Sequence, residues 1–261
     1  MSRINIDHQS AVILHQFDYR NSSLIVHFFL SHFGKISAIA KGVKGHSGKS
    51  ASKKSSMALF QPFQNLSVSL TGKHELLILK NIELNPQAAE ANWQLRGKSL
   101  YCAYYINELL LRLLPAFTEC EEIFSSYVQA LDALVLCSSA DTNNESYSAY
   151  ETPLRIFELQ LLEQLGYGLN LTDEVNSGAM VDTDKQYFYS MESGPSLIRK
   201  ADIKQLAISG QSLVNLAEQQ LHDQKTLQES KHLLKWAINE QLDNKPLKSR
   251  ELFKQLYATG S

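Results

Sequence analysis

The chain has 261 residues, 44% of them hydrophobic and 20% charged, which is the composition of a globular protein with a substantial core. No stretch has the roughly 18 uncharged apolar residues of a membrane-spanning helix, and residues 1–7 lack the apolar core of a secretion signal. The three cysteines, Cys102, Cys120 and Cys137, are odd in number and argue against a disulfide framework. We therefore expect a cytoplasmic protein with one large domain or two smaller ones.

The formal net charge of −2 conceals a strong asymmetry along the chain. Residues 19–74 contain no Asp or Glu. The rest of the chain contains 17 basic residues and all 27 acidic residues, which gives it a net charge of −10. The eight basic residues of the segment are Arg20, Lys35, Lys41, Lys44, Lys49, Lys53, Lys54 and Lys73. Such segregation predicts that this end of the protein binds a polyanion. The alternative is a solvated loop that carries its lysines by chance.

The first 85 residues predict short β-strands separated by turn signals. Apolar, β-branched and alternating segments place them at 11–17, 22–30, 36–41, 65–71 and 76–84. Five short strands in so little sequence favour a small closed barrel of the OB type. Residues 42–56, between the third and fourth strands, are dominated by Gly, Ser and Lys, which predicts a mobile basic loop.

Helical periodicity dominates after residue 85. It predicts helices over 95–114 and 121–136, a third that begins after a polar linker at 138–148, helical spacing over 211–242, and a short last helix over 249–256. In the first helix the core candidates are Leu100, Tyr104, Leu111 and Leu114. Thr152 and Pro153 read as N-cap and first residue of the third helix, which Gly166 ends.

These elements predict an α+β protein. Its N-terminal domain, 1–84, is an OB-fold β-barrel, and its mainly α-helical domain, 85–261, holds a small irregular insertion at 169–195. Whether Lys248 and Arg250 near the C-terminus bind a partner or lie on a plain surface stays open.

Motifs for catalysis and metal binding are weak. Gly42 and Gly48 are separated by five residues, whereas a P-loop needs four, and no helix pattern follows. His27 and His32 have no carboxylate close in sequence, and no cysteine pair has zinc spacing. Asp182 and Asp184 read as a solvated turn. We expect no enzyme, no cofactor and no metal site.

The basic segment is better suited to DNA. Lysines that follow phosphates, together with aromatic rings that stack on bases, bind single strands on OB surfaces. We assign DNA binding to the eight basic residues named above. Phe17, Tyr19, Phe33 and Phe60 are stacking candidates, although each fits the barrel core equally well.

Several segments, in order along nearly the whole chain, resemble a known family. They include Tyr19-Arg-Asn-Ser-Ser-Leu24, Leu59-Phe-Gln-Pro-Phe63, Leu154-Arg-Ile-Phe-Glu-Leu159, Leu165-Gly-Tyr-Gly168 and Lys245-Pro-Leu-Lys-Ser-Arg-Glu-Leu252. The set resembles RecO, the bacterial recombination-mediator family. Some members of that family carry a four-cysteine zinc site in the insertion. Residues 171–194 contain no cysteine, so the zinc-finger-like insertion lacks metal ligands here.

The resemblance implies a non-enzymatic role in DNA repair at the nucleoid. It implies binding of single- and double-stranded DNA, annealing of complementary strands, and action with RecR to load RecA. It also implies docking on the acidic C-terminal tail of single-stranded DNA-binding protein. By similarity the tail site comprises Arg155, Phe157, Leu159, Leu162 and Val181.

Two alternatives stay open at this point. A tail that ends in aspartate, phenylalanine and a free carboxylate needs an apolar pocket beside a guanidinium, and Arg155 opposes the dipole at the start of its helix. The competing explanation is an ion pair of Arg155 with Glu151 or Glu158. For the whole protein, the alternative function is an adaptor whose basic loop binds acidic proteins.

Overall fold

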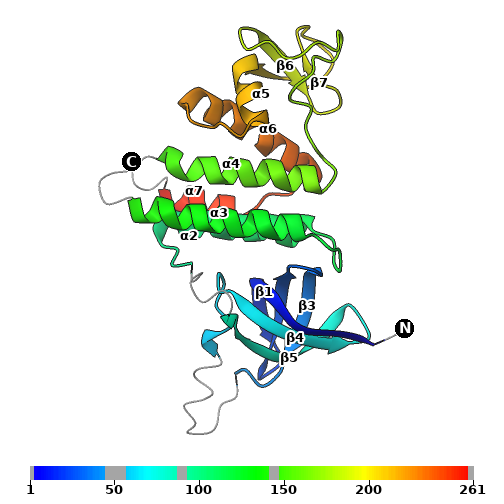
Figure 1. Cartoon of the computed structure of the whole chain (residues 1–261), viewed down its shortest axis with the longest axis vertical. Helices are drawn as coiled ribbons and strands as arrows, with labels where there is room; N and C mark the ends of the chain where they lie inside the picture. The colour runs from blue at the N-terminus through cyan, green and yellow to red at the C-terminus, as the bar shows by residue number, and fades with distance from the viewer. Residues whose placement is uncertain (1–2, 45–56, 87–92, 141–146, 258–261) are drawn as a thin grey trace. The chain divides into compact units, whose positions relative to one another are not determined.

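The computed structural model describes residues 3–44, 57–86, 93–140 and 147–257 (Figure 1). The chain divides into two compact units, the first formed by residues 1–135 with 247–261 and the second by residues 136–246. None of the described helices is long and apolar enough to cross a membrane. The predicted division into domains at residue 84 stays a prediction.

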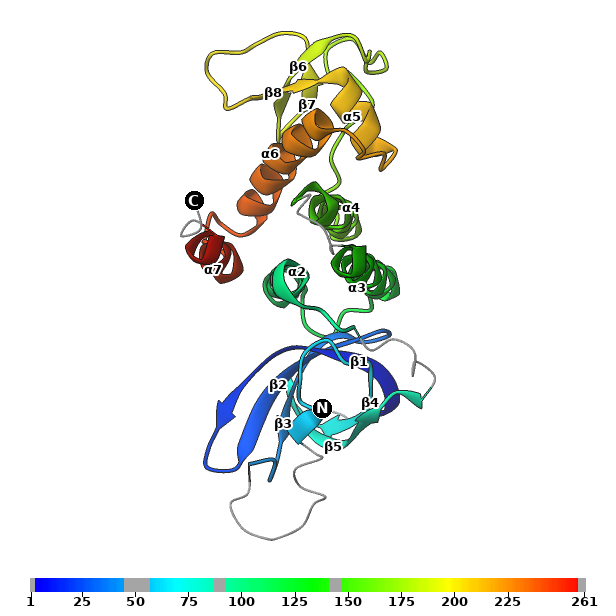
Figure 2. The ribbon, with the colours of Figure 1, turned by 90° about the vertical axis from the view of Figure 1, so that its left-hand side faces the viewer.

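The first unit contains a five-stranded barrel. Its strands are β1 (Ile4–Tyr19), β2 (Ser23–Leu30), β3 (Gly34–Ala40), β4 (Leu66–Gly72) and β5 (Leu76–Leu84). They pair in the order β1-β2-β3-β5-β4 and close into a barrel, in which only β3 and β5 are parallel (Figure 2). The OB-type fold predicted from the sequence is confirmed.

β1 is much longer than the predicted 11–17, because it pairs with β2 through one half and with β4 through the other. Its register shifts between Ile6 and Gln9 and again between Ile13 and His15. Such bulges bend a strand and increase its twist, which lets one strand close the barrel. Alternate side chains fill the interior, among them Ile13, Val26, Phe28, Ile36, Ala38 and Val68.

A buried asparagine joins the barrel to the helices α2 (Gly97–Leu113) and α3 (Glu121–Ala140). The Asn107 amide of α2 donates to the carbonyl oxygens of Ile13 (3.3 Å) and Leu14 (3.1 Å) in β1. Tyr127 of α3 donates its hydroxyl to Asn107 Oδ1 at 2.9 Å. Burial of polar groups is tolerated where each has a partner, and this network satisfies both β1 carbonyls.

The buried face of α2 differs from the predicted one. Of the four core candidates only Leu114 is buried, and Tyr104 is 42% exposed, where it packs edge-on against Phe63. The face toward the core instead includes Tyr105, Ile106 and Asn107. Apolar residues at helical spacing, Cys102, Ile106 and Leu109, mark this face, and the polar Asn107 is buried among them.

The C-terminal helix α7 (Lys248–Tyr257) returns to the first unit. The Glu108 carboxylate accepts hydrogen bonds from the backbone amides of Lys248 (2.9 Å) and Ser249 (2.8 Å). Arg250 donates to the Tyr105 hydroxyl at 2.9 Å and lies over its ring. Arg250 and the Lys248 amide therefore help to attach α7 to α2.

In the second unit, α4 (Tyr147–Gln164) begins before the predicted start. Thr152 is not its N-cap and Pro153 lies within the helix, so the predicted helix start is wrong. Proline cannot donate to the carbonyl four residues earlier. The Cys137 thiol donates to that carbonyl, of Ala149, at 3.2 Å, while Thr152 donates its hydroxyl to Leu221 O at 3.1 Å.

The rest of the second unit is a small sheet and two helices. The strands β6 (Gln186–Ser190), β7 (Gly194–Ser196) and β8 (Leu206–Ser209) form an antiparallel sheet in the order β7-β6-β8. The segment predicted with helical spacing forms α5 (Gly210–Ala217) and α6 (Gln224–Gln241), with Asp223 as the N-cap of α6. Asp182 accepts from the Asp184 amide (3.0 Å) and pairs with Lys185 (3.2 Å), consistent with the predicted turn.

Glu174 is the centre of the irregular part of this unit. Its carboxylate accepts from the amides of Asn176, Ser177 and Leu197 and from the side chains of Asn176 and Ser177. The hydrogen bonds, first that from the Ser177 hydroxyl, lower the pKa of Glu174 to about 2. The carboxylate thus ties residues 174–177 to the end of β7.

We expect Glu174→Gln to loosen this region, because an amide cannot accept the same set of donors. Because the pKa of Glu174 is lower in the folded state than in the unfolded state, the ionised carboxylate stabilises the folded state. This stabilisation is complete above the ordinary pKa of 4.5 and is lost as pH falls toward 2. Amide hydrogen exchange at Ser177 and Leu197 should accelerate in the variant. The exposed Glu192→Gln is the control, and equal protection in both variants would contradict this role.

Candidate nucleic-acid interface

The outward-facing side chains of β1, β2 and β3 form a continuous surface on the barrel. Register places His15, His27 and Ser37 in one row across the three strands, and Phe17, Ile25 and Ile39 in the next. Their neighbours in sequence, such as Val26 and Ala38, point into the core. We name this surface the outer β1–β3 face, and its residues are His15, Phe17, Tyr19, Ile25, His27, Ser37 and Ile39.

Three rings cluster on this face. The Phe17 ring centroid lies 5.7 Å from that of His27 and 6.3 Å from that of His15, and the two imidazoles stack at 6.5 Å. Phe17 is 44% exposed. Exposed, mutually supported rings provide a platform on which unpaired bases stack.

His27 is the most buried member of the cluster. Its Nδ1 is hydrogen-bonded to the Ser37 hydroxyl at 2.8 Å. Burial, then the charges of His15 and Lys35, lower the pKa of His27 below its usual 6.5. The ring is therefore neutral at pH 7 and presents a π-face to a base, not a charge to a phosphate.

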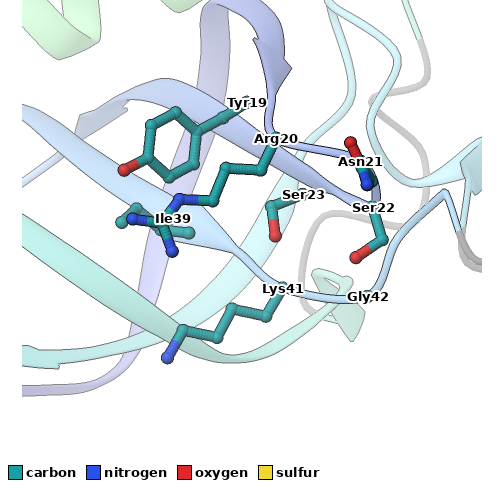
Figure 3. Close-up of a pocket in the computed structure, with 8 residues that line it drawn as sticks. All are labelled: Tyr19, Arg20, Asn21, Ser22, Ser23, Ile39, Lys41 and Gly42. Carbon is teal, nitrogen blue, oxygen red and sulfur yellow. The ribbon is translucent and has the colours of Figure 1, made fainter.

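A basic pocket adjoins the face at the turn between β1 and β2. Its volume is about 800 Å³. Figure 3 shows the residues that line it, which are Tyr19, Arg20, Asn21, Ser22, Ser23, Ile39, Lys41 and Gly42. The Arg20 guanidinium lies 5.1 Å from the centre of the Tyr19 ring. Arg20 and Lys41 are both exposed, so two cations and one aromatic ring converge within a single concavity.

The other predicted DNA-binding residues are placed differently. Lys44 pairs with Asp18, and the Lys35 ammonium donates to the Leu111 carbonyl at 2.6 Å. Burial lowers the pKa of Lys35. Lys73 is exposed in the turn between β4 and β5. Lys49, Lys53 and Lys54, together with most of the predicted mobile loop, lie outside the described residues.

The stacking candidates also separate. Phe60 is 2% exposed and belongs to the barrel core, whereas Phe33 is 36% exposed. The prediction of stacking residues did not include His15 and His27. Their positions two residues before Phe17 and two after Ile25 could have revealed them, because alternate residues of a strand share a face.

The predicted tail-binding residues lie in the second unit and are buried. Arg155 is 6% exposed, and its guanidinium donates to Glu158 Oε1 at 2.8 Å, so the structure contains one of the two competing ion pairs. The apolar residues of the set are all less than a tenth exposed, namely Phe157, Leu159, Leu162 and Val181. A peptide would reach them only after side chains that cover them move. Their role in binding stays a prediction.

Comparisons with known proteins match nearly the whole chain. Residues 1–86 match the family model described as Recombination protein O N terminal, and residues 94–251 match Recombination protein O C terminal. The DNA repair protein RecO of Pseudoalteromonas atlantica is 39% identical over 246 residues, covering 94% of this chain and 93% of that one. Those of Methylococcus capsulatus and Nitrosococcus oceani are 37% and 36% identical, and each alignment covers 97% of this chain and at least 94% of the relative.

Proposed function

The chain belongs to the RecO family of DNA repair proteins, and on this premise we propose that it binds DNA through the outer β1–β3 face and the adjoining basic pocket. The observation that carries the proposal is the convergence of Arg20, Lys41 and the Tyr19 ring beside the rings of Phe17 and His27. Cations of this kind bind phosphates of single or double strands, whereas exposed rings require unpaired bases.

The proposed activity is annealing of complementary single strands without catalysis. Cations that neutralise phosphates reduce the repulsion between two strands. Phosphate contacts read no base edges, so binding should be weakly selective for sequence and leave most bases available for pairing. In this proposal the protein acts at the nucleoid, and no step makes or breaks a covalent bond.

We propose three protein partners by similarity to the family. The acidic tail of single-stranded DNA-binding protein docks on the second unit around Arg155, RecR acts together with this chain, and RecA is loaded as the indirect result. A buried guanidinium supports the first of these, because its Nε has no hydrogen-bond partner among the described residues. A carboxylate that entered the pocket would supply one.

Fluorescence annealing of complementary oligonucleotides tests the function directly. The wild-type chain should accelerate annealing of strands precoated with single-stranded DNA-binding protein, and should bind labelled oligonucleotides with a steep salt dependence. An adaptor for acidic proteins would give neither result. Binding without any acceleration would limit the proposal to DNA binding.

A further inference from the structure

His32, Glu119 and Glu121 come together on the surface of the first unit. One ligand atom from each lies within 4.8 Å of the others. His32 follows β2, whereas Glu119 lies two residues before α3 and Glu121 is its first residue, so the group unites segments almost 90 residues apart. In the described ranges, 3–44, 57–86, 93–140 and 147–257, no other group of three such ligands is this close.

The backbone holds these segments together by itself. Lys35 forms a parallel bridge with Ala116, and the Phe117 amide donates to Lys35 O at 3.2 Å. A Cβ on Gly34 would lie 2.1 Å from the Thr118 carbonyl oxygen, so the turn after β2 is pressed against the residues before α3. The ligand atoms are therefore brought close before any ion binds, which reduces the conformational cost of binding.

Imidazole nitrogen and carboxylate oxygen are both ligands of zinc, at about 2.0–2.2 Å. Ligand atoms around one tetrahedral ion lie about 3.4 Å apart, so the observed spacing closes with small side-chain movements. We propose that His32, Glu119 and Glu121 form a surface site for a divalent transition-metal ion, with zinc as the probe and water completing its coordination. A metal there would link the turn after β2 to the N-terminus of α3.

A simpler role for the same residues makes a different prediction. His32 Nδ1 contacts Glu121 Oε1 directly, and carboxylates at a helix N-terminus are stabilised by the helix dipole. Those effects need no ion and give no response to zinc. His8 and Glu83 form another exposed contact, at 3.6 Å, but with a single carboxylate, which makes His8 the matched control.

The test is a zinc titration of the full chain against a chromophoric chelator, with circular dichroism of every variant. We expect one zinc ion per chain, and at least about tenfold weaker binding for His32→Ala and Glu119→Gln, since indirect partners of a metal already contribute about 10–100-fold. His8→Ala should bind as the wild type does. Zinc should also raise the melting temperature of the wild type but not of His32→Ala.

Three results would overturn the site. The first is that the chain binds no zinc in competition with the chelator. The second is that His32→Ala binds zinc as tightly as the wild type does. The third is that His32→Ala and His8→Ala lose the same amount of zinc affinity. Cys120→Ser adds a further check, because this thiol lies between the two glutamates in sequence. If binding is lost in Cys120→Ser and kept in His32→Ala, the cysteine is the ligand and the proposed triad is wrong.

Discussion

Replacing both Arg20 and Lys41 by alanine is expected to weaken DNA binding by about tenfold to thirtyfold. Non-specific DNA complexes have dissociation constants of about 10⁻⁴–10⁻⁶ M and involve several phosphate contacts. Each contact therefore contributes about 1 kcal/mol of binding free energy. Two contacts are lost in this variant, so the slope of log affinity against log salt should also fall by about 1.4 for a single strand. Fluorescence anisotropy with a labelled oligonucleotide at several salt concentrations measures both quantities.

Lys225 and Lys235 provide the matched control. Both are exposed on α6 in the second unit, so Lys225→Ala with Lys235→Ala removes the same formal charge from outside the proposed interface. This control should keep the affinity and nearly the whole salt slope. If the two double variants lose the same amount of DNA affinity, the total charge of the protein, and not the pocket beside β1, governs binding.

Replacing Phe17 distinguishes the contribution of base stacking to DNA binding from that of charge. Phe17→Ala should weaken single-strand binding by about 1–3 kcal/mol, the usual cost of losing one stacked base, while leaving the salt slope unchanged. Duplex DNA offers no unpaired bases to this face, so its binding should change little. Equal effects on single and double strands would remove Phe17 from the interface.

The barrel was predictable because its local patterns agree with its tertiary structure. β2 and β3 alternate between core and surface, and turn residues separate them. Other features depended on contacts that no local pattern contains. In α2 the polar Asn107 is buried where it satisfies carbonyls of β1, and in α4 Pro153 lies inside the helix, where a thiol replaces the missing amide.

The residues of the candidate sites were likewise predictable only where local sequence was enough to identify them. Arg20 and Lys41 could be assigned from charge alone, and the structure places them in one pocket. Lys35 and Lys44 are equally basic in sequence, but their hydrogen-bonding and ion-pair partners appear only in the fold. The approach of Glu119 and Glu121 to His32 was likewise invisible, because sequence spacing reveals only ligands that are near one another along the chain.

Replacing Arg155 alone is expected to destabilise the second unit by about 3–5 kcal/mol. Its side chain is 7% exposed and that of Glu158 is 1% exposed, so the variant removes one charge of a buried ion pair. Replacing both residues by methionine should restore most of the stability, because apolar residues of similar volume substitute well for such pairs. Thermal unfolding of the single and double variants measures the difference.

The double variant, Arg155→Met with Glu158→Met, is therefore the proper test of tail binding. If the guanidinium holds the terminal carboxylate of the partner, this folded variant should bind a synthetic acidic peptide ending in aspartate and phenylalanine about 1.5–3 kcal/mol more weakly than the wild type. The same peptide with an amidated end should bind both proteins equally weakly. A double variant with wild-type affinity for the free-carboxylate peptide would assign Arg155 to the fold of α4 alone.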